Sequence, residues 1–217
     1  MNIFKKNPED EKYVGAMRRG LAVTIDVWIV LVLRIIFMEF LGRVWMNQQL
    51  INFFQEFQEK FGTETIKDVP EHIDFIIHHP IFIQSLIFYF LVVMIGAIYH
   101  AYLNSSNWNG TIGKRIMKIM IITENSLKIS FKRGILHYFL SVLPFAYLIY
   151  LTSYQVRHDV GFYQALTASD LNVLLGLIFV LWVQIHLFTK KRTTAYDLIC
   201  HTVIVNGKTP YKWPWSK

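Results

Sequence analysis

The sequence predicts an all-α integral membrane protein with four transmembrane helices. Hydrophobic residues make up 53% of its 217 residues and aromatic residues 16%, which is typical of membrane proteins rather than soluble domains. Four apolar runs lie at about 20–41, 81–103, 135–152 and 171–188. Each approaches the roughly 20 residues with which a helix crosses about 30 Å of hydrocarbon. We therefore expect four spans within one membrane domain, residues 1–217.

The first run is expected to remain in the mature chain as an uncleaved anchor. It is too long for the apolar core of a signal peptide, and no short apolar run precedes a small-residue cleavage site. After it, the segment at about 46–61 places apolar side chains at three- and four-residue spacing. They are Leu50, Phe53, Phe54, Phe57 and Phe61. This pattern predicts an amphipathic helix that lies on the outer membrane surface or continues the first span.

The loop between the second and third runs is short but organised. Its sequence GTIGKRIMKIMIITENSLKISFKRG begins with a basic segment and continues with β-branched residues near 119–123. Turn-forming residues at 124–126 separate these from a second stretch near 127–131. The pattern predicts a small cytoplasmic β-hairpin between the second and third spans.

Basic residues predict the orientation, because cytoplasmic loops collect Lys and Arg. The N-terminal tail, the loop between runs two and three, and the C-terminal tail together hold 17 of the 22 lysines and arginines. We therefore expect both termini in the cytoplasm. The net charge of +7 alternates with the loops rather than forming one basic face, so anionic lipid headgroups are expected as partners and nucleic acid is not.

No enzyme, cofactor or metal site is expected. GTIGKR lacks the spacing of a phosphate-binding loop, and no zinc-protease or nucleophile-elbow motif is present. The single Cys200 excludes an internal disulfide and a cysteine-rich metal site. His72, His78 and His79 lie together with Asp74, but they lack a helical pair in register with a carboxylate.

Four segments of the chain carry a family resemblance. They are RGLAVTID in the first run, TIGKRIMKIMIIT in the loop, FKRGILHYF entering the third run, and RTTAYDLICHTVIV after the fourth. Together and in this order they resemble the RDD family of bacterial membrane proteins, which is named for one Arg and two Asp residues. The matching positions are Arg19, Asp26 and Asp197. The chain departs from the family at Ile112, where Pro is frequent, and at Tyr196, where His is common.

The resemblance implies a multi-pass protein of the bacterial inner membrane with a largely unknown function. The family has been suspected of transporting unidentified ligands, and some members are linked to exchange of sodium and protons. No cofactor is implied.

The three named residues predict a charged cluster at the cytoplasmic side. Arg19 and Asp26 are seven residues apart, so they share a helical face but lie about 10.5 Å apart along the axis. That distance is too long for direct contact between rigid rotamers, but an extended Arg19 with an intervening water or a second carboxylate could close it. Asp197, nine residues after the fourth run, could be that second carboxylate. A carboxylate near the bilayer middle costs about 2.5–3.5 kcal/mol, so Asp26 should face protein rather than lipid.

Two interpretations of this cluster stay open. In the first, Asp26, Asp197 or both form a cation or proton site of a small secondary transporter that exchanges monovalent cations for protons and works as a homo-oligomer. In the second, Arg19 neutralises the two carboxylates and holds the helices together, and the basic inner loop binds lipid or a partner.

Four further residues are secondary candidates: Arg18, Arg192, His100 and Arg34. Arg18 and Arg192 are basic residues close in sequence to the cluster. His100 lies near the inner end of its span, as do His137 and His186, where a titrating group suits a proton relay or an interfacial anchor. Arg34 points roughly 80° away from Asp26 and is expected to pair with Glu39 or to extend outward.

Overall fold

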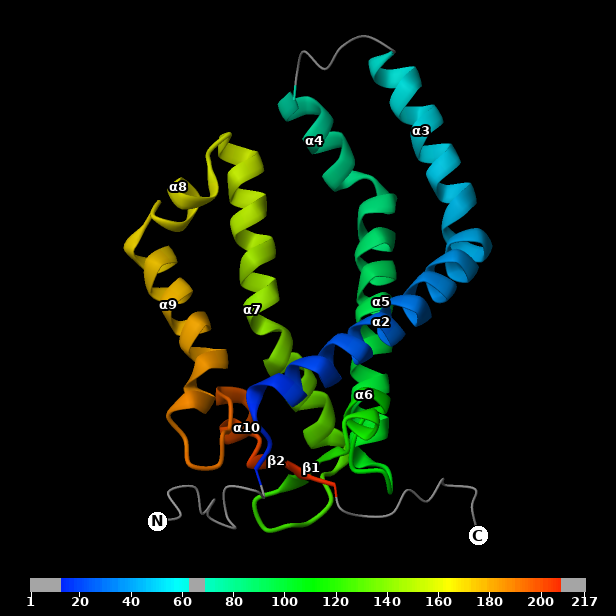
Figure 1. The fold of residues 1–217 in the computed structure, drawn as a ribbon. Coiled ribbons are helices and arrows are strands. Elements are labelled where there is room, and N and C mark those ends of the chain that lie inside the picture. Colours follow the sequence, from blue (N-terminus) through cyan, green and yellow to red (C-terminus); the bar gives the residue numbers. More distant parts are fainter. Residues whose placement is uncertain (1–12, 63–68, 208–217) are drawn as a thin grey trace, which may run out of the picture. The chain divides into compact units, whose positions relative to one another are not determined.

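The computed structural model describes residues 13–62 and 69–207 of the chain. The described residues are mostly helical and divide into two compact units. Of these residues, one unit contains 13–27 and 97–207, and the other contains 28–62 and 69–96. Figure 1 shows the elements in sequence colours, and each unit is described here by itself.

Within residues 13–62 and 69–207, four helical runs are long and apolar enough to cross a membrane, and they correspond to the four apolar runs of the sequence. The first comprises α2 (Ala16–Leu41), the π-helical η1 (Gly42–Met46) and α3 (Asn47–Phe61). The others are α5 (Pro80–Ser105), α7 (Phe131–His158), and α9 (Asp170–Gln184) with the 3-10 helix η2 (Ile185–Leu187). At most 28% of the most apolar window in any of them is buried, so their apolar side chains remain available to lipid.

The amphipathic segment is a helix that continues the first span. α3 follows α2 through η1 without a break, and α4 (Val69–His78) precedes α5. Aromatic rings join α3 to α4: Phe53 stacks on Phe75 with ring centroids 6.0 Å apart, and Phe61 lies 4.2 Å from the ring of His72. These contacts explain the three- and four-residue spacing of the phenylalanines in the sequence.

A two-stranded antiparallel sheet joins the central loop to the C-terminal segment. β1 (Ile119–Thr123) pairs with β2 (Thr202–Asn206), with Ile121 opposite Ile204. The side chains of both strands pack into a buried core that includes Val14, Ala22 and Ile129. This core ties residues far apart in the sequence into one unit.

The predicted hairpin is therefore wrong in its second strand. The stretch at 127–130 forms no strand, because Thr123 and Leu127 close a tight turn and Ser130 then begins α7. The Ser130 side chain accepts a hydrogen bond from the backbone N–H of Arg133. Ser130 is therefore the N-cap at which α7 begins. The strand partner of β1 is β2 instead.

Candidate functional site

Asp197 lies at the start of α10 (Ala195–Ile199), where a reciprocal cap fixes its side chain. The backbone N–H of Thr194 donates to Asp197 Oδ2 at 3.1 Å, and the Thr194 hydroxyl donates to the same oxygen at 2.8 Å. In return, the backbone N–H of Asp197 lies 3.4 Å from the Thr194 hydroxyl oxygen. The sequence TTAYD thus encodes a capping box that aims a fully buried carboxylate into the protein.

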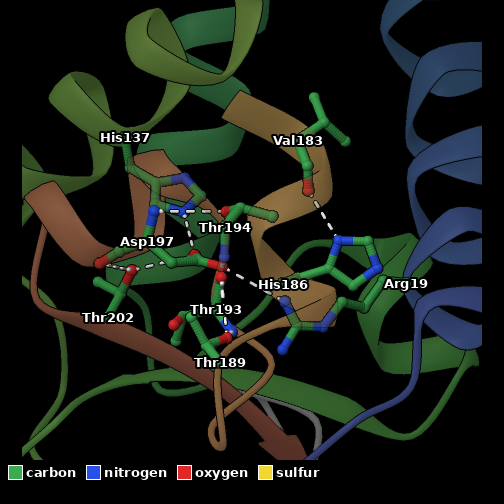
Figure 2. A network of polar contacts seen from close by, with 9 residues as sticks. All are labelled: Arg19, His137, Val183, His186, Thr189, Thr193, Thr194, Asp197 and Thr202. Carbon is green, nitrogen blue, oxygen red and sulfur yellow. Dashed lines mark hydrogen bonds and ion pairs between the residues drawn. The ribbon is translucent and has the colours of Figure 1, made fainter. Parts of the chain in front are cut away.

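Three further elements donate to the Asp197 carboxylate (Figure 2). From α2, Arg19 Nη1 lies 3.3 Å from Oδ2. From α7, His137 Nε2 lies 2.9 Å from Oδ1, and from β2 the Thr202 hydroxyl lies 3.2 Å from the same oxygen. Every donor stabilises the ionised form, so Asp197 anchors α2, α7 and β2 to α10.

The Arg19 guanidinium contributes a single hydrogen bond to this pair. Its Nε and second amino group are buried without a hydrogen-bond partner among the described residues. Because the pair is not bidentate, the geometry of Asp197 is fixed mainly by the cap and by His137.

The surroundings of Asp197 lower the pKa of its carboxyl group. Burial by itself raises the pKa of this carboxyl, but the hydrogen bond and charge of His137 and the charge of Arg19 outweigh burial and lower the pKa from 3.8 to about 2. Because the folded value is the lower one, the ionised carboxylate stabilises the fold above pH 3.8, and this contribution disappears as the pH falls toward 2.

We expect the Asp197→Asn variant to lose less stability than the wild type on acidification from about pH 4 to pH 2. The shift corresponds to about 2 kcal/mol, at roughly 1.4 kcal/mol per pKa unit. Unfolding midpoints in detergent, measured across this range, test the expectation. The exposed Asp159→Asn variant is the control and should follow the wild type.

Asp26 occupies a separate pocket in the same unit. It is 1% exposed, and its carboxylate accepts hydrogen bonds from three uncharged groups. The hydroxyl of Tyr99 on α5 lies 2.8 Å from Oδ1, the backbone N–H of Gly113 lies 2.9 Å from Oδ1, and the hydroxyl of Thr111 donates to Oδ2. Within the described residues, Asp26 forms no ion pair.

The short helix α6 (Ile112–Ile116) provides most of this pocket because it packs directly on α2. Thr111 caps α6, its side chain accepting from the backbone N–H of Lys114. A methyl group at Gly113 would lie 2.1 Å from the carbonyl oxygen of Ala22 and 2.9 Å from Asp26 Cγ. Only glycine permits this approach, which brings the Gly113 N–H to the carboxylate.

Lys114 is a buried cation that sequence reasoning missed. Its Nζ donates to Asn104 Oδ1 at 2.9 Å, and its charge interacts electrostatically with both carboxylates. Burial lowers the pKa of Lys114 from 10.5 to about 8, although the negative charges of Asp26 and Asp197 oppose the shift. In the sequence, Lys114 looks like the other basic residues of this loop, which are normally solvated. Its position next to Gly113 and after the Thr111 cap is the feature that sets it apart from them.

The structure divides the predicted cluster. Arg19 and Asp197 form an ion pair, whereas no hydrogen bond or ion pair in the described part of the chain joins Asp26 to either of them. Lys114 interacts electrostatically with all three. The two carboxylates therefore have different environments: that of Asp197 is cationic, and that of Asp26 is made of neutral donors.

The secondary candidates lie outside both pockets. Arg18 donates to the side chain of Asn206 and to the carbonyl of Met117, and so ties α2 to the sheet. Arg192 occupies a turn with φ 52° and affects Arg19 only through charge repulsion. The ring of His100 packs between Tyr99 and Tyr138, with centroid distances of 5.1 and 5.3 Å.

Arg34 belongs to the other unit, residues 28–96. Its Nε donates to the carbonyl oxygen of Val92 at 3.2 Å, while Glu39 forms an ion pair with Arg43 four residues later. Glu39, the predicted partner of Arg34, thus pairs with Arg43, which lies one turn further along the same helical run.

The remaining histidines have ordinary partners. His78 pairs with Asp74 at 3.2 Å and His79 pairs with Glu56 at 3.2 Å. His186 donates from Nδ1 to the carbonyl oxygen of Val183 at 2.7 Å (Figure 2). No set of three or more His, Cys, Asp and Glu side chains in residues 13–62 and 69–207 is arranged to hold a metal ion.

Cys200 provides a reporter of folding for this unit. It is the single cysteine of the chain, is 2% exposed, and burial raises the pKa of its thiol to about 11. We expect the native thiol to react with a maleimide at pH 7 at least about 100-fold more slowly than the thiol of the unfolded chain, because few molecules carry an accessible thiolate. Mass spectrometry before and after unfolding in SDS checks this; equal rates would contradict the buried position.

The family comparison covers the part of the chain that contains Arg19, Asp26 and Asp197. The family model for the RDD family matches residues 13–201, which include all three residues. Comparisons with curated proteins and with solved structures gave no match. Since the matched region covers most of the chain and contains both carboxylate pockets, this membrane protein belongs to the RDD family.

Proposed function

We propose that this multi-pass membrane protein is a small secondary transporter that exchanges monovalent cations for protons, with Asp26 as the cation site. The observation that carries the proposal is the pocket of Asp26. Its carboxylate is 1% exposed and its hydrogen-bond donors are two hydroxyl groups and one backbone N–H. Buried intramembrane carboxylates are costly and mark ion or proton pathways.

The atoms around Asp26 suit a small hard cation. Such ions prefer oxygen ligands, and hydroxyl oxygens can turn from donating toward the carboxylate to coordinating an ion beside it. The carboxylate oxygens and the hydroxyls of Thr111 and Tyr99 would supply four such oxygens. A divalent ion favours more than one carboxylate, so the single acid supports a monovalent substrate.

Asp197 suits a different task. Its carboxylate is paired with Arg19, hydrogen-bonded by His137 and held by its cap, so a cation would have to displace existing partners to bind there. We assign the structural role to Asp197 and the ion exchange to Asp26. The Arg19–Asp197 pair also favours a second candidate function, in which both pockets only stabilise the fold of an accessory membrane protein.

The proposal includes the membrane setting expected from the sequence. With both termini in the cytoplasm of a bacterial cell, both carboxylates belong to the cytoplasmic side of the inner membrane, where the basic loops meet anionic headgroups. Four helices enclose little volume, so a homo-oligomer is the expected working form. We propose no enzymatic activity, cofactor or nucleic-acid partner.

Dissipation of a pH gradient tests the transporter. Inside-out vesicles are energised by respiration, and the collapse of the gradient is followed after addition of sodium, lithium or potassium. We expect a cation-dependent collapse with the wild type, at least a tenfold smaller rate with Asp26→Asn, and wild-type rates with the exposed Asp159→Asn control. Equal collapse in vesicles with and without the protein would rule out exchange and leave the accessory role.

A further inference from the structure

The unit of residues 28–62 and 69–96 contains a cavity beside η1. Its volume is about 350 Å³, at the lower end of the range for small-molecule sites. One wall comes from the continuous run of α2, η1 and α3, and the other comes from α5. The hydrogen bond from Arg34 Nε to the carbonyl oxygen of Val92 joins α2 to α5 within the same unit.

The π-helical turn η1 forms part of the wall. Such turns are rare, bend the helices that contain them, and occur often at functional sites. Figure 1 shows the bend where η1 joins α2 to α3. Gly42 begins η1 and lines the cavity, and a methyl group at this position would meet no neighbouring atom within 4 Å. The space next to Gly42 is therefore open to a ligand.

The inside of the cavity suits an acyl chain. Met38, Met46, Leu50 and Phe88 provide an apolar lining, and methionine side chains adapt well to flexible apolar ligands. Sites of this kind bind mainly through apolar contact and use a few polar groups to orient the ligand. Because the helical run is apolar enough to cross a membrane, the apolar chains that surround it are those of lipids.

The rim of the cavity carries one charge of each sign. Arg43 Nε donates to Glu39 Oε1 at 2.7 Å, and Arg43 Nη2 donates to the same oxygen. The two side chains are largely exposed, at 78% for Arg43 and 63% for Glu39. This arrangement leaves donors of the guanidinium and the second oxygen of the carboxylate directed to other partners than each other. A ligand with both charges in its headgroup can therefore bind both residues.

The rim lies at the depth of lipid headgroups. The first apolar run of the sequence ends at residue 41, between Glu39 and Arg43. Trp45 and Tyr89 are aromatic residues of the kind that gathers at the same level of a membrane. The cavity thus joins an apolar interior to a positive and a negative group at the membrane surface.

We propose that this cavity binds a phospholipid whose zwitterionic headgroup carries a primary ammonium group. One acyl chain occupies the apolar lining, the phosphate binds Arg43, and the ammonium group binds Glu39. The side chains of Asn47 and Ser85 also line the cavity and supply donors for the ester carbonyls. An anionic lipid without an amine brings a negative charge to Glu39 and binds more weakly. The site is independent of ion exchange at Asp26.

Native mass spectrometry of the purified full-length protein in detergent tests the headgroup. The protein is titrated with phosphatidylethanolamine or with phosphatidylglycerol of matched acyl chains. We expect the first lipid to bind about fivefold more tightly, the upper part of what an exposed ion pair contributes. Glu39→Gln should remove this preference. Asp74→Asn is the control and should keep it, because Asp74 is an equally exposed acid that pairs with His78 four residues later.

Filling the cavity tests the place of the acyl chain. Gly42→Leu puts a side chain into the open space and should weaken phosphatidylethanolamine binding at least about tenfold, the effect of keeping about two methylene groups out of the lining. Gly20→Leu is the matched control and should bind like the wild type. A methyl group at Gly20 also meets no atom within 4 Å, and Gly20 does not line the cavity.

Three results would overturn the proposal. They are equal wild-type affinity for the two lipids, unchanged binding by Gly42→Leu, and equal binding of glycerophosphoethanolamine. This soluble compound has the headgroup without acyl chains and should bind at least about tenfold more weakly than the lipid. If Gly42→Leu does not fold, phosphatidylethanolamine with a photoreactive acyl chain decides on the wild type. Labelling of residues 38–50 and 85–89 supports the site, and labelling confined to other segments contradicts it.

Discussion

Replacing Gly113 with alanine is expected to destabilise the protein by about 3 kcal/mol, the upper part of the range for overpacked sites. The added methyl group would lie 2.1 Å from the carbonyl oxygen of Ala22, which is helix backbone and cannot rotate away. α6 would have to move off α2, and the hydrogen bond from the Gly113 N–H to Asp26 would break. We therefore expect loss of the Asp26 pocket together with loss of stability.

Thermal unfolding in detergent, read out through the reactivity of Cys200, measures this effect. Gly20→Ala is the matched control, because a methyl group at Gly20 of α2 would meet no atom within 4 Å. It should be neutral or stabilising by up to about 1 kcal/mol, as alanine favours the helix. A Gly113→Ala protein as stable as Gly20→Ala would show that α6 does not pack on α2 as described.

Replacing Asp197 with asparagine is expected to cost about 3–5 kcal/mol at neutral pH. Arg19 would keep a buried charge without its partner, and His137 would lose its carboxylate acceptor. The cap of α10 would weaken as well, because a carboxylate accepts from the Thr194 backbone more strongly than an amide. We expect a low folded yield and rapid labelling of Cys200.

A second substitution separates the charge effect from the cap. In Arg19→Met/Asp197→Asn the uncompensated guanidinium is gone, so the double variant should be more stable than Asp197→Asn alone by about 1–3 kcal/mol. Unfolding midpoints in the same detergent measure the difference. If adding Arg19→Met to Asp197→Asn lowers stability further, the ion pair is not what Asp197 contributes.

The sequence predicted the helical framework well, because long apolar runs in a chain that meets lipid leave few alternatives. The four spans and the helix at 47–61 follow from hydropathy and periodicity alone. The sheet could not be predicted in the same way. β1 pairs with β2, about 80 residues further along the chain, and local pattern gives no register for such distant partners.

The sequence predicted only part of the candidate site, because contacts between distant segments form the rest of it. Spacing placed Arg19 and Asp26 two turns apart and left their direct contact open, and the place of Asp197 after the fourth span suggested it as the second carboxylate; the structure pairs Asp197 with Arg19. Sequence spacing could not show that Thr111 and Gly113 donate hydrogen bonds to the Asp26 carboxylate. Lys114 was missed because a lysine in a basic loop is normally solvated, and only tertiary packing buries it.

The central claim is that the two carboxylates have separate roles, with ion exchange at Asp26 and structure at Asp197. The most direct test is cation-driven proton movement across proteoliposomes, normalised to the folded protein in the same preparation, for wild type and Asp26→Asn. We predict that Asp26→Asn stays folded, with slow Cys200 labelling, and loses the flux. A variant that keeps the wild-type flux per folded molecule would contradict the account, as would a wild type without flux.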